Sequence, residues 1–403
     1  MSRALEGVRV LEVAQWWFVP AAGAVLADWG ADVVKVEHPV SGDGQRGLMT
    51  SGLIPDTGGV NFMMEQSNRG KKSVGIDIAT DDGRELIYRM AEKSDVFLTN
   101  FLPPARRKLG IDVEDIRTRN PNIIYVRGHG QGARGPDSEK AGYDGTSFWS
   151  RGGIGQSITP AGHEYPIMQK AAFGDSIGAM TIAGGIAAAL FKRATTGEAS
   201  VVDVSLLGTA MWTLAPDIVA SRLLKGDMPS FNHSDMPNPV VSNYRTKDGR
   251  WVMLTMLQSD RLWPDFCRHI GREDMIEDER FRDAMSRFQN RQECIRILDE
   301  VFAARTLAEW KENFKTMEGA WAPLQTAAEL HEDEQALANG YFPEVEGGDE
   351  GQFRLVASPV QFDESPTELT RAPEHGEHTE TVLMEMGIEW EEIERLKAAK
   401  AIL

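Results

Sequence analysis

The beginning of the chain alternates between strand and helix patterns, and this alternation constrains the fold more than any other feature of the sequence. Val8–Val13 is an apolar run of strand length, and Val19–Trp29 carries apolar residues at helical spacing. Gly30 ends that helix, and Asp32–Val36 is a short β-branched strand. Two strands joined by one helix are typical of a doubly wound parallel sheet.

The same alternation continues along the chain. Strands are predicted over Lys72–Ile78, Asp95–Thr99 and Asn122–Arg127, and a helix over Asp81–Ser94 lies between the first two strands. We therefore predict an α/β fold, with a large Rossmann-like domain and a parallel sheet over residues 1–225.

A polar, Pro/Gly-rich stretch marks the predicted domain boundary. Leu206–Leu224 is predicted as a helix, and Gly226, Pro229 and Asn232–Pro239 interrupt the pattern that follows it. A hairpin turn at Lys247–Gly249 and then several helices predict a smaller α+β domain over residues 226–330. Residues 331–403 form the remaining segment and end in an amphipathic helical pair.

A glycine cluster after one strand faintly resembles a dinucleotide-binding fingerprint. Gly128–Gly132 follows the strand Asn122–Arg127, but Ala133–Gly142 is a loop sequence and not the helix that such a fingerprint requires. We therefore expect no NAD.

Charge and cysteine content narrow the functional classes. The formal net charge of −18 argues against a general nucleic-acid or anionic-membrane binder. Two cysteines in 403 residues imply no disulfide framework, and no apolar signal core stands at the N-terminus, so a cytoplasmic protein is expected. The longest apolar run, around Gly178–Phe191, is expected to be too short and too rich in Gly and Ala to span a bilayer.

Asp175 lies between glycines at the start of that run. Thr181–Phe191 is rich in Ala, Leu and Ile, and Lys192, Arg193 and Gly197 follow, which predicts a helix with cations and a glycine at its C-terminal end. Asp175 is then expected at the helix entrance, where backbone N–H groups favour negative charge. An Asp in this position is most often an N-cap, so a catalytic role needs support from the rest of the chain.

Basic and polar side chains recur after the predicted strands, against an acidic background. Each alone is more often a solvated surface charge. Because ligands of open α/β sheets bind outside the carboxyl ends of the strands, their common placement suits a phosphate-bearing cofactor. The residues predicted to bind it are His38, Arg69, Lys71, Lys72, Asn100, Lys108 and Arg127.

Several short motifs, in order along nearly the whole chain, resemble those of the family III CoA-transferases, the group of formyl-CoA, carnitine and bile-acid CoA-transferases. The matching segments are Leu26–Glu37, Asn68–Ser73, Asn100–Pro103 with Lys108–Gly110, Gly142–Asp144, Val202–Ser205 and Ala372–Thr379. The resemblance implies that Asp175 is a nucleophile and that His38, Lys71, Asn100, Lys108 and Arg127 lie around CoA. It also implies an interlocked homodimer, and a large domain to which the C-terminal part, residues 331–403, returns.

The resemblance implies transfer of CoA from an acyl-CoA thioester to a carboxylic acid, through a mixed anhydride and an aspartyl-CoA thioester on Asp175. Backbone N–H groups of Gly152, Gly153, Gly155 or the start of the helix are expected to stabilise the oxyanions. The residues predicted to line the acyl pocket are Trp17, Phe18, His129, Tyr143 and Trp149, with Trp16 and Phe148 beside them. Packing in the core or at a dimer contact is the alternative for these aromatic residues.

Two other functions stay open on the sequence. An α-methylacyl-CoA racemase of the same superfamily would use a His where Tyr143 stands, and Tyr is a poor base at neutral pH; His129 lies close in sequence and keeps this alternative alive. A non-catalytic acyl-CoA-binding protein is the other. His375 and His378 have helical ligand spacing, but they lie in a Pro/Gly segment, and no metal is expected.

Overall fold

A computed structural model describes residues 3–48, 57–160 and 162–403. The described chain forms two compact units. The first consists of Met1–Ile158, Ile167–Val219 and Glu334–Leu403, and the second of Thr159–Pro166 and Ala220–Asp333. The short segment Thr159–Pro166, which the sequence analysis left in the large domain, thus groups with the second unit.

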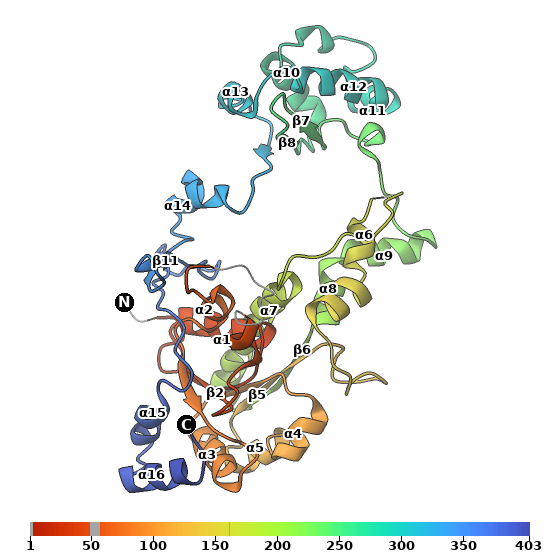
Figure 1. Ribbon diagram of the computed structural model, residues 1–403. Helices are drawn as coiled ribbons and strands as arrows, with labels where there is room; N and C mark the ends of the chain where they lie inside the picture. The colour runs from red at the N-terminus through yellow and green to blue at the C-terminus, as the bar shows by residue number, and fades with distance from the viewer. Residues whose placement is uncertain (1–2, 49–56, 161) are drawn as a thin grey trace. The chain divides into compact units, whose positions relative to one another are not determined.

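A six-stranded parallel sheet forms the centre of the first unit (Figure 1), and the predicted α/β class is confirmed. The strand order is β3-β2-β1-β4-β5-β6, which is the order of doubly wound nucleotide-binding sheets. The edge strand β6 was not predicted, because it is only partly buried and so lacks the continuous apolar run of the central strands. The strands are β1 (Arg9–Val13), β2 (Asp32–Glu37), β3 (Lys72–Gly75), β4 (Val96–Thr99), β5 (Ile124–His129) and β6 (Val201–Ser205).

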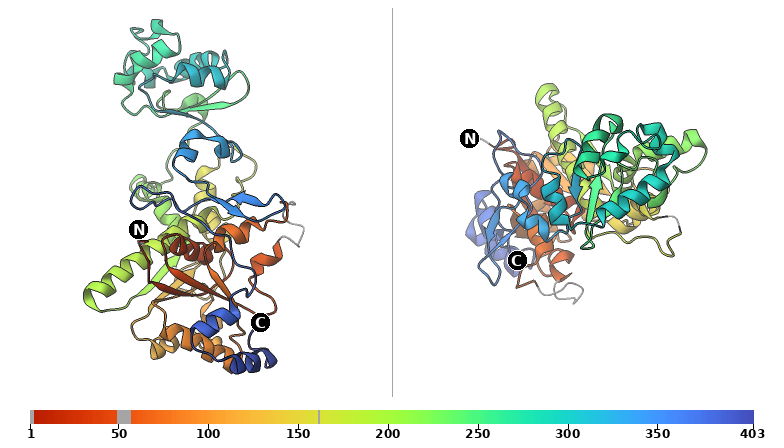
Figure 2. Two further views of the ribbon diagram at one scale, coloured as in Figure 1. Left: turned by 90° about the vertical axis from the view of Figure 1, so that its left-hand side faces the viewer. Right: turned by 90° about the horizontal axis from the view of Figure 1, so that it is seen from above.

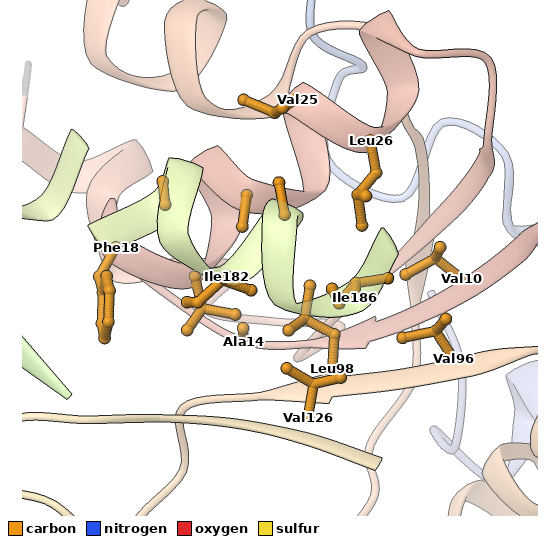
Figure 3. Close-up of a cluster of buried hydrophobic side chains, with 14 of the residues drawn as sticks. Val10, Ala14, Phe18, Val25, Leu26, Val96, Leu98, Val126, Ile182 and Ile186 are labelled. Atoms are coloured by element: carbon orange, nitrogen blue, oxygen red, sulfur yellow. The ribbon is translucent and has the colours of Figure 1, made fainter. Parts of the chain in front are cut away.

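Helices cover both faces of this sheet. Alternate strand residues point to opposite faces, so that Val10 and Leu98 pack with α1 and α7 on one face (Figure 3), whereas Leu11 and Phe97 pack with α3, α5, α15 and α16 on the other. Figure 2 shows the two C-terminal helices beside α3. The helices on the two faces are α1 (Phe18–Asp28) and α7 (Phe173–Thr196), and α3 (Asp81–Glu92), α5 (Val113–Arg119), α15 (Thr379–Glu385) and α16 (Trp390–Ala398).

Helix α7 differs from its prediction. It begins before Asp175 and has 24 residues, so by length and composition it could cross a membrane, and the expectation that this run is too short is wrong. The helix is a core element: Ile182, Ala183 and Ile186 are fully buried against α1 and the sheet (Figure 3).

The chain also contains helices and strands outside the central sheet. The segment predicted as one helix, 206–224, forms two helices. These elements are α2 (Phe62–Asn68), α4 (Pro103–Leu109), the π-helix η2 (Asp144–Arg151), α6 (Ile154–Ile158), α8 (Leu206–Thr213), α9 (Ala215–Leu224), α14 (Glu334–Ala338) and the hairpin strands β10 (Glu344–Glu346) and β11 (Gln352–Arg354), together with the 3₁₀ turn η1 (Gly44–Leu48).

The second unit is a small α+β structure with its own core. Its predicted hairpin is present, and a third antiparallel strand joins it from a distant part of the sequence. The strands are β7 (Asn243–Arg245), β8 (Trp251–Leu254) and β9 (Trp321–Pro323), and the helices are α10 (Ser259–His269), α11 (Ala284–Gln289), α12 (Arg291–Phe302) and α13 (Leu307–Asn313). Trp263, Phe266 and Trp310 are buried at the centre of this core.

Candidate active site

A cavity of about 580 Å³ lies where the strand order of the sheet reverses. The chain leaves β1 toward β2 and later returns on the other side of β1 as β4, so the loops after β1 and β4 diverge and leave a crevice. Gln15 follows β1 and Asn100 follows β4, and the two are joined by hydrogen bonds from Gln15 N to Asn100 Oδ1 (3.1 Å) and from Asn100 Nδ2 to Gln15 O (2.7 Å). His129, at the end of β5, and Asp175 also line this cavity.

Asp144, and not Asp175, caps the helix that carries the predicted nucleophile. Both carboxylate oxygens of Asp144 accept the backbone N–H of Gly174 at 3.1 Å. Gly174 permits this approach, since a Cβ there would lie 2.5 Å from Asp144 Oδ1. The N-cap interpretation of Asp175 is therefore wrong: Asp175 lies within the first turn of α7, and its side chain has no hydrogen-bond or ion-pair partner among the described residues.

Burial, together with the negative charge of Asp144, raises the pKa of Asp175 to about 7. Burial also raises the pKa of Asp144, against the backbone N–H groups that it accepts. A carboxyl group with a pKa near neutrality gives up its proton under working conditions and is still basic enough to be an effective nucleophile.

This pKa predicts a pH dependence of catalysis. If ionised Asp175 is the attacking group, kcat/KM rises with pH through about 7. In Asp144→Asn the like charge is removed while one side-chain oxygen still accepts the helix N–H groups, so the rising limb moves to lower pH. A pH–rate profile of both proteins measures this shift. A limb that stays in place in the variant would contradict the coupling of the two carboxyl groups.

Two residues that line the cavity, Trp16 and Ala172, have left-handed backbone conformations, with φ of 69° and 59°. Such conformations cost about 1–3 kcal/mol for residues other than glycine and persist where surrounding contacts fix them. The Trp16 N–H donates to Asp43 Oδ1 (3.0 Å), and Asp43 is held in turn by the buried Lys35 Nζ (2.9 Å). The Trp16 ring meets that of Tyr143 edge to face, with centroids 6.5 Å apart.

Most of the residues predicted for the acyl pocket lie together in the cavity lining, namely Trp17, Phe18, His129 and Tyr143, with Trp16. Trp17 Nε1 donates to the hydroxyl of Ser176, the neighbour of Asp175, at 3.1 Å. Trp149 is buried outside this lining, and its Nε1 donates to the carbonyl oxygen of Ile167 (2.9 Å). These contacts support the alternative interpretation of Trp149, in which it packs in the core and does not line the acyl pocket.

Arg69 and Lys72, predicted to bind CoA, form ion pairs within the protein. Arg69 is 4% exposed and binds Asp28 through two hydrogen bonds of 3.0 and 2.7 Å. Lys72 lies near Asp32 (3.2 Å) and Glu385 (3.3 Å). Neither residue lines the cavity at the ends of β1 and β4.

Lys71 is buried in the interior and also lies outside the cavity lining. Its Nζ donates to Glu12 Oε2 (2.8 Å), the carbonyl oxygen of Pro20 (2.7 Å) and Asn68 Oδ1 (2.9 Å). Gly23 of α1 leaves room for this pair, because a Cβ at that position would lie 2.0 Å from Glu12 Oε2. Burial lowers the pKa of Lys71 to about 8, against the opposing charge of Glu12. These contacts describe a structural ion pair.

Of the other residues predicted to bind CoA, Asn100 lines the cavity, whereas His38 and Lys108 lie outside its lining. His38 Nδ1 accepts the backbone N–H of Val40 (3.2 Å), outside the cavity lining. Lys108 is exposed on α4, one turn beyond Ala105, which lines the cavity, and its ammonium has no partner in the described part of the chain.

Arg127 and Asp203 form an ion pair across β5 and β6. The two residues are opposite one another in the sheet, and Arg127 binds Asp203 through two hydrogen bonds of 2.7 and 2.9 Å. His129, two residues further along β5, reaches the same carboxylate through Nε2 (3.0 Å). Asp203 and Asp144 were not predicted to belong to the site. Both lie in segments that resemble the family's motifs, and that resemblance was the signal in the sequence that could have identified them.

The helix start cannot supply the expected oxyanion donors. The N–H groups of residues 173, 174 and 175 are directed to Asp144, and the N–H of Ser176 donates to the carbonyl oxygen of Ala172 (2.9 Å). Gly152, Gly153 and Gly155 are outside the cavity lining. Within the described residues, no group of three or more His, Cys, Asp or Glu could hold a metal ion.

Comparison of the chain with known proteins identifies its family. The sequence profile of CoA-transferase family III matches residues 5–379. The chain belongs to CoA-transferase family III. The resemblance drawn from the motifs is thereby confirmed, and the enzyme is an acyl-CoA:carboxylate CoA-transferase that uses CoA thioesters as substrates.

Relatives of this family III enzyme match it over nearly their full lengths. It is 33% identical to (R)-2-hydroxy-4-methylpentanoate CoA-transferase of Clostridioides difficile, over 99% of both chains. It is also 33% identical to cinnamoyl-CoA:phenyllactate CoA-transferase of Clostridium sporogenes, over 98% of this chain and 97% of the relative. Among solved structures, a CAIB/BAIF family protein from Brucella suis superposes with a TM-score of 0.82 at 26% identity, over 96% of this chain and 100% of that one.

Proposed function

We propose that Asp175 carries the transferred group and that the preferred acids have an apolar body. The Asp175 carboxylate attacks the thioester carbonyl, and the CoA thiolate leaves, which gives a mixed anhydride. The thiolate attacks the aspartyl carbonyl, the donor acid departs as its carboxylate, and an aspartyl-CoA thioester remains. The acceptor carboxylate attacks this thioester, and the released thiolate then takes the new acyl group and regenerates Asp175.

The observation that carries this proposal is a carboxylate without a protein partner that lies in the lining of a cavity. Each Asp elsewhere in the neighbourhood, namely Asp43, Asp144 and Asp203, accepts hydrogen bonds from protein donors. Asp175 accepts none from the described residues, and burial together with the negative charge of Asp144 raises its pKa to about 7. An unpaired, half-buried carboxylate is unfavourable for folding and is retained at sites that need its reactivity.

The cavity lining supports acids with an apolar body over dicarboxylates. Its side chains include Trp16, Trp17, Phe18, Phe101 and Met63, whereas Lys140 and His129 are the cationic or imidazole groups among the described residues that line it. Lys140 is paired with Asp137 (2.7 Å). Among the described lining residues, the second carboxylate of a dicarboxylic acid would therefore find no unpaired lysine or arginine and would be desolvated without a counter-charge. The relatives named above for 2-hydroxy-4-methylpentanoate and phenyllactate fit this class of substrate.

For CoA itself, the placement of Lys108 supports a role in phosphate binding. Its exposed ammonium stands one helical turn from the cavity-lining Ala105, and Asn100 lies at the cavity edge of the same segment. His38 and Arg127 remain predictions of the resemblance.

An acid panel tests the substrate class. With one acyl-CoA donor, we expect the enzyme to transfer CoA to branched or aromatic monocarboxylic acids with a kcat/KM at least about 10-fold above that for succinate, glutarate or oxalate. Trp16→Ala is expected to narrow this difference, because it opens one wall of the cavity. Efficient transfer to the dicarboxylates would contradict the proposal. Deuterium entry at the α-carbon without CoA exchange would instead support the racemase alternative.

An interlocked homodimer is also proposed, because helices α7, α8 and α9 expose large apolar side chains. Trp212 is 81%, Leu223 77% and Phe191 72% exposed, and α9 has no buried residue. Large apolar side chains exposed to this extent on successive helices are typical of an interface. Sedimentation equilibrium is expected to give twice the chain mass, and Trp212→Asp to weaken association, whereas Trp390→Asp on the C-terminal helix α16 serves as the matched control. A monomeric wild type would contradict the dimer.

A further inference from the structure

His129 is a buried side chain with one occupied and one open ring nitrogen. It is 8% exposed and lines the cavity that contains Asp175. Its Nε2 lies 3.0 Å from Asp203 Oδ1. Among the residues that the structure describes, Nδ1 has no hydrogen-bond partner.

The neighbours of His129 determine which ring nitrogen carries the proton. Asp203 also accepts two hydrogen bonds from Arg127. Burial alone would raise the pKa of Asp203, but the hydrogen bonds from His129 and Arg127 and the charge of Arg127 outweigh it, so the pKa is well below its usual range. An ionised carboxylate only accepts hydrogen bonds, so Nε2 is the protonated nitrogen, and in the neutral imidazole Nδ1 presents a lone pair.

The turn that holds His129 places it close to the nucleophile's helix. Gly130 follows His129, and a Cβ there would lie 2.5 Å from the Cα of Gly142. The segment that begins at Gly142 continues directly into Asp144, which caps α7 beside Asp175. Close backbone packing therefore joins the end of β5 to the start of α7, and both line one cavity.

We propose that Nδ1 of His129 accepts a hydrogen bond from a hydroxyl group of the substrate acid, and that the enzyme therefore selects hydroxy acids over their deoxy analogues. A hydroxyl group on an otherwise apolar acid can donate a hydrogen bond to Nδ1. A second carboxylate could not, because an ionised carboxylate only accepts hydrogen bonds and would meet the Nδ1 lone pair without a proton between them. A deoxy acid would leave Nδ1 desolvated and unpaired, which is the situation in which a site discriminates most strongly. The inference rests on the proposed function, since it concerns the acid that Asp175 serves.

The test compares acceptor acids that differ only in the hydroxyl group. With a single acyl-CoA donor, kcat/KM is measured for 2-hydroxy-3-phenylpropanoate and 3-phenylpropanoate, and for the corresponding 3-hydroxy acid. We expect the wild type to favour one of the hydroxy acids by about 10- to 100-fold. His129→Leu, in which Asp203 keeps both bonds to Arg127, should bring the ratio near one, and His129→Gln, whose amide oxygen can accept, should restore part of it.

Gln131→Leu is the matched control, because it removes another polar side chain from the same lining, and it should leave the ratio of the two acids as in the wild type. A wild-type ratio near one, or a ratio that survives His129→Leu, would overturn the inference. Transfer of CoA to both acids, with an adduct on Asp175, would show in that case that the proposed function stands. If no acid is an acceptor and no adduct forms, the proposed function itself has failed.

Discussion

Replacing Asp175 by Asn is expected to lower CoA transfer at least about 10³-fold, because the amide cannot attack the thioester or form the anhydride. The substitution keeps the size of the side chain, and the cap of α7 is supplied by Asp144. The helix and the cavity should therefore persist, so the loss reports chemistry and not misfolding. Exchange of labelled CoA between an acyl-CoA and a free acid measures it. If Asp175→Asn exchanged CoA at the wild-type rate, Asp175 would not be the nucleophile.

The same substitution is expected to stabilise the fold at pH 8. Because the pKa of Asp175 in the folded protein is raised to about 7, the folded state holds this proton more tightly than the unfolded state. Ionisation therefore reduces stability as the pH rises from about 4 through 7, and an Asn, which never ionises, avoids that loss. We expect a gain of up to about 4 kcal/mol at pH 8 and none at pH 4. A variant that is less stable than the wild type at pH 8 would contradict the isolated carboxylate described here.

Lys71→Met is expected to destabilise the protein by about 3–5 kcal/mol, since it leaves the buried Glu12 without the partner at 2.8 Å. Lys35, which lies 3.2 Å from the same carboxylate, relieves part of that loss. Chemical denaturation monitored by tryptophan fluorescence gives the change in the free energy of unfolding. A metabolite-binding role alone would leave this free energy unchanged.

Lys72→Met is the matched control for Lys71→Met. The two lysines are neighbours in the sequence, but Lys72 is partly exposed and its ion pairs with Asp32 and Glu385 lie in water. Exposed pairs contribute about 0–1 kcal/mol, so the control should change stability little. Equal effects of the two substitutions would contradict the distinction between a buried and a surface ion pair. If Lys71→Met kept its stability but lost affinity for CoA, Lys71 would instead bind CoA, as the resemblance implies.

The sheet was predictable because its signal is local. Strand-length apolar runs separated by a helix repeat every few tens of residues, and each can be recognised within its own window. β6 and β9 were not predicted. The first is a partly exposed edge strand without a continuous apolar run. The second, Trp321–Pro323, pairs with a hairpin about 70 residues earlier in the sequence, and no local pattern marks this pairing.

The candidate site was predictable only in part, because the partners of a side chain depend on the tertiary structure and can be distant in the sequence. Asp175 could be singled out from the glycines around it, but Asp144, which caps its helix, lies 31 positions earlier, and no local pattern links the two. Cations after strands suggested a phosphate site, but sequence cannot tell a lysine that faces solvent from one that faces a buried carboxylate. Arg69 and Lys71 have such carboxylates, Asp28 and Glu12.

The measurement that tests the central claim most directly is the trapping of the covalent intermediate. The wild-type enzyme is mixed with acyl-CoA in the absence of an acceptor acid, quenched in acid and digested, and its peptides are weighed by mass spectrometry. We predict that the peptide containing Asp175 gains the mass of CoA less one water, and that hydroxylamine removes this gain. An enzyme that exchanges CoA at its full rate while that peptide stays unmodified, or that carries the adduct on another residue, would contradict the account.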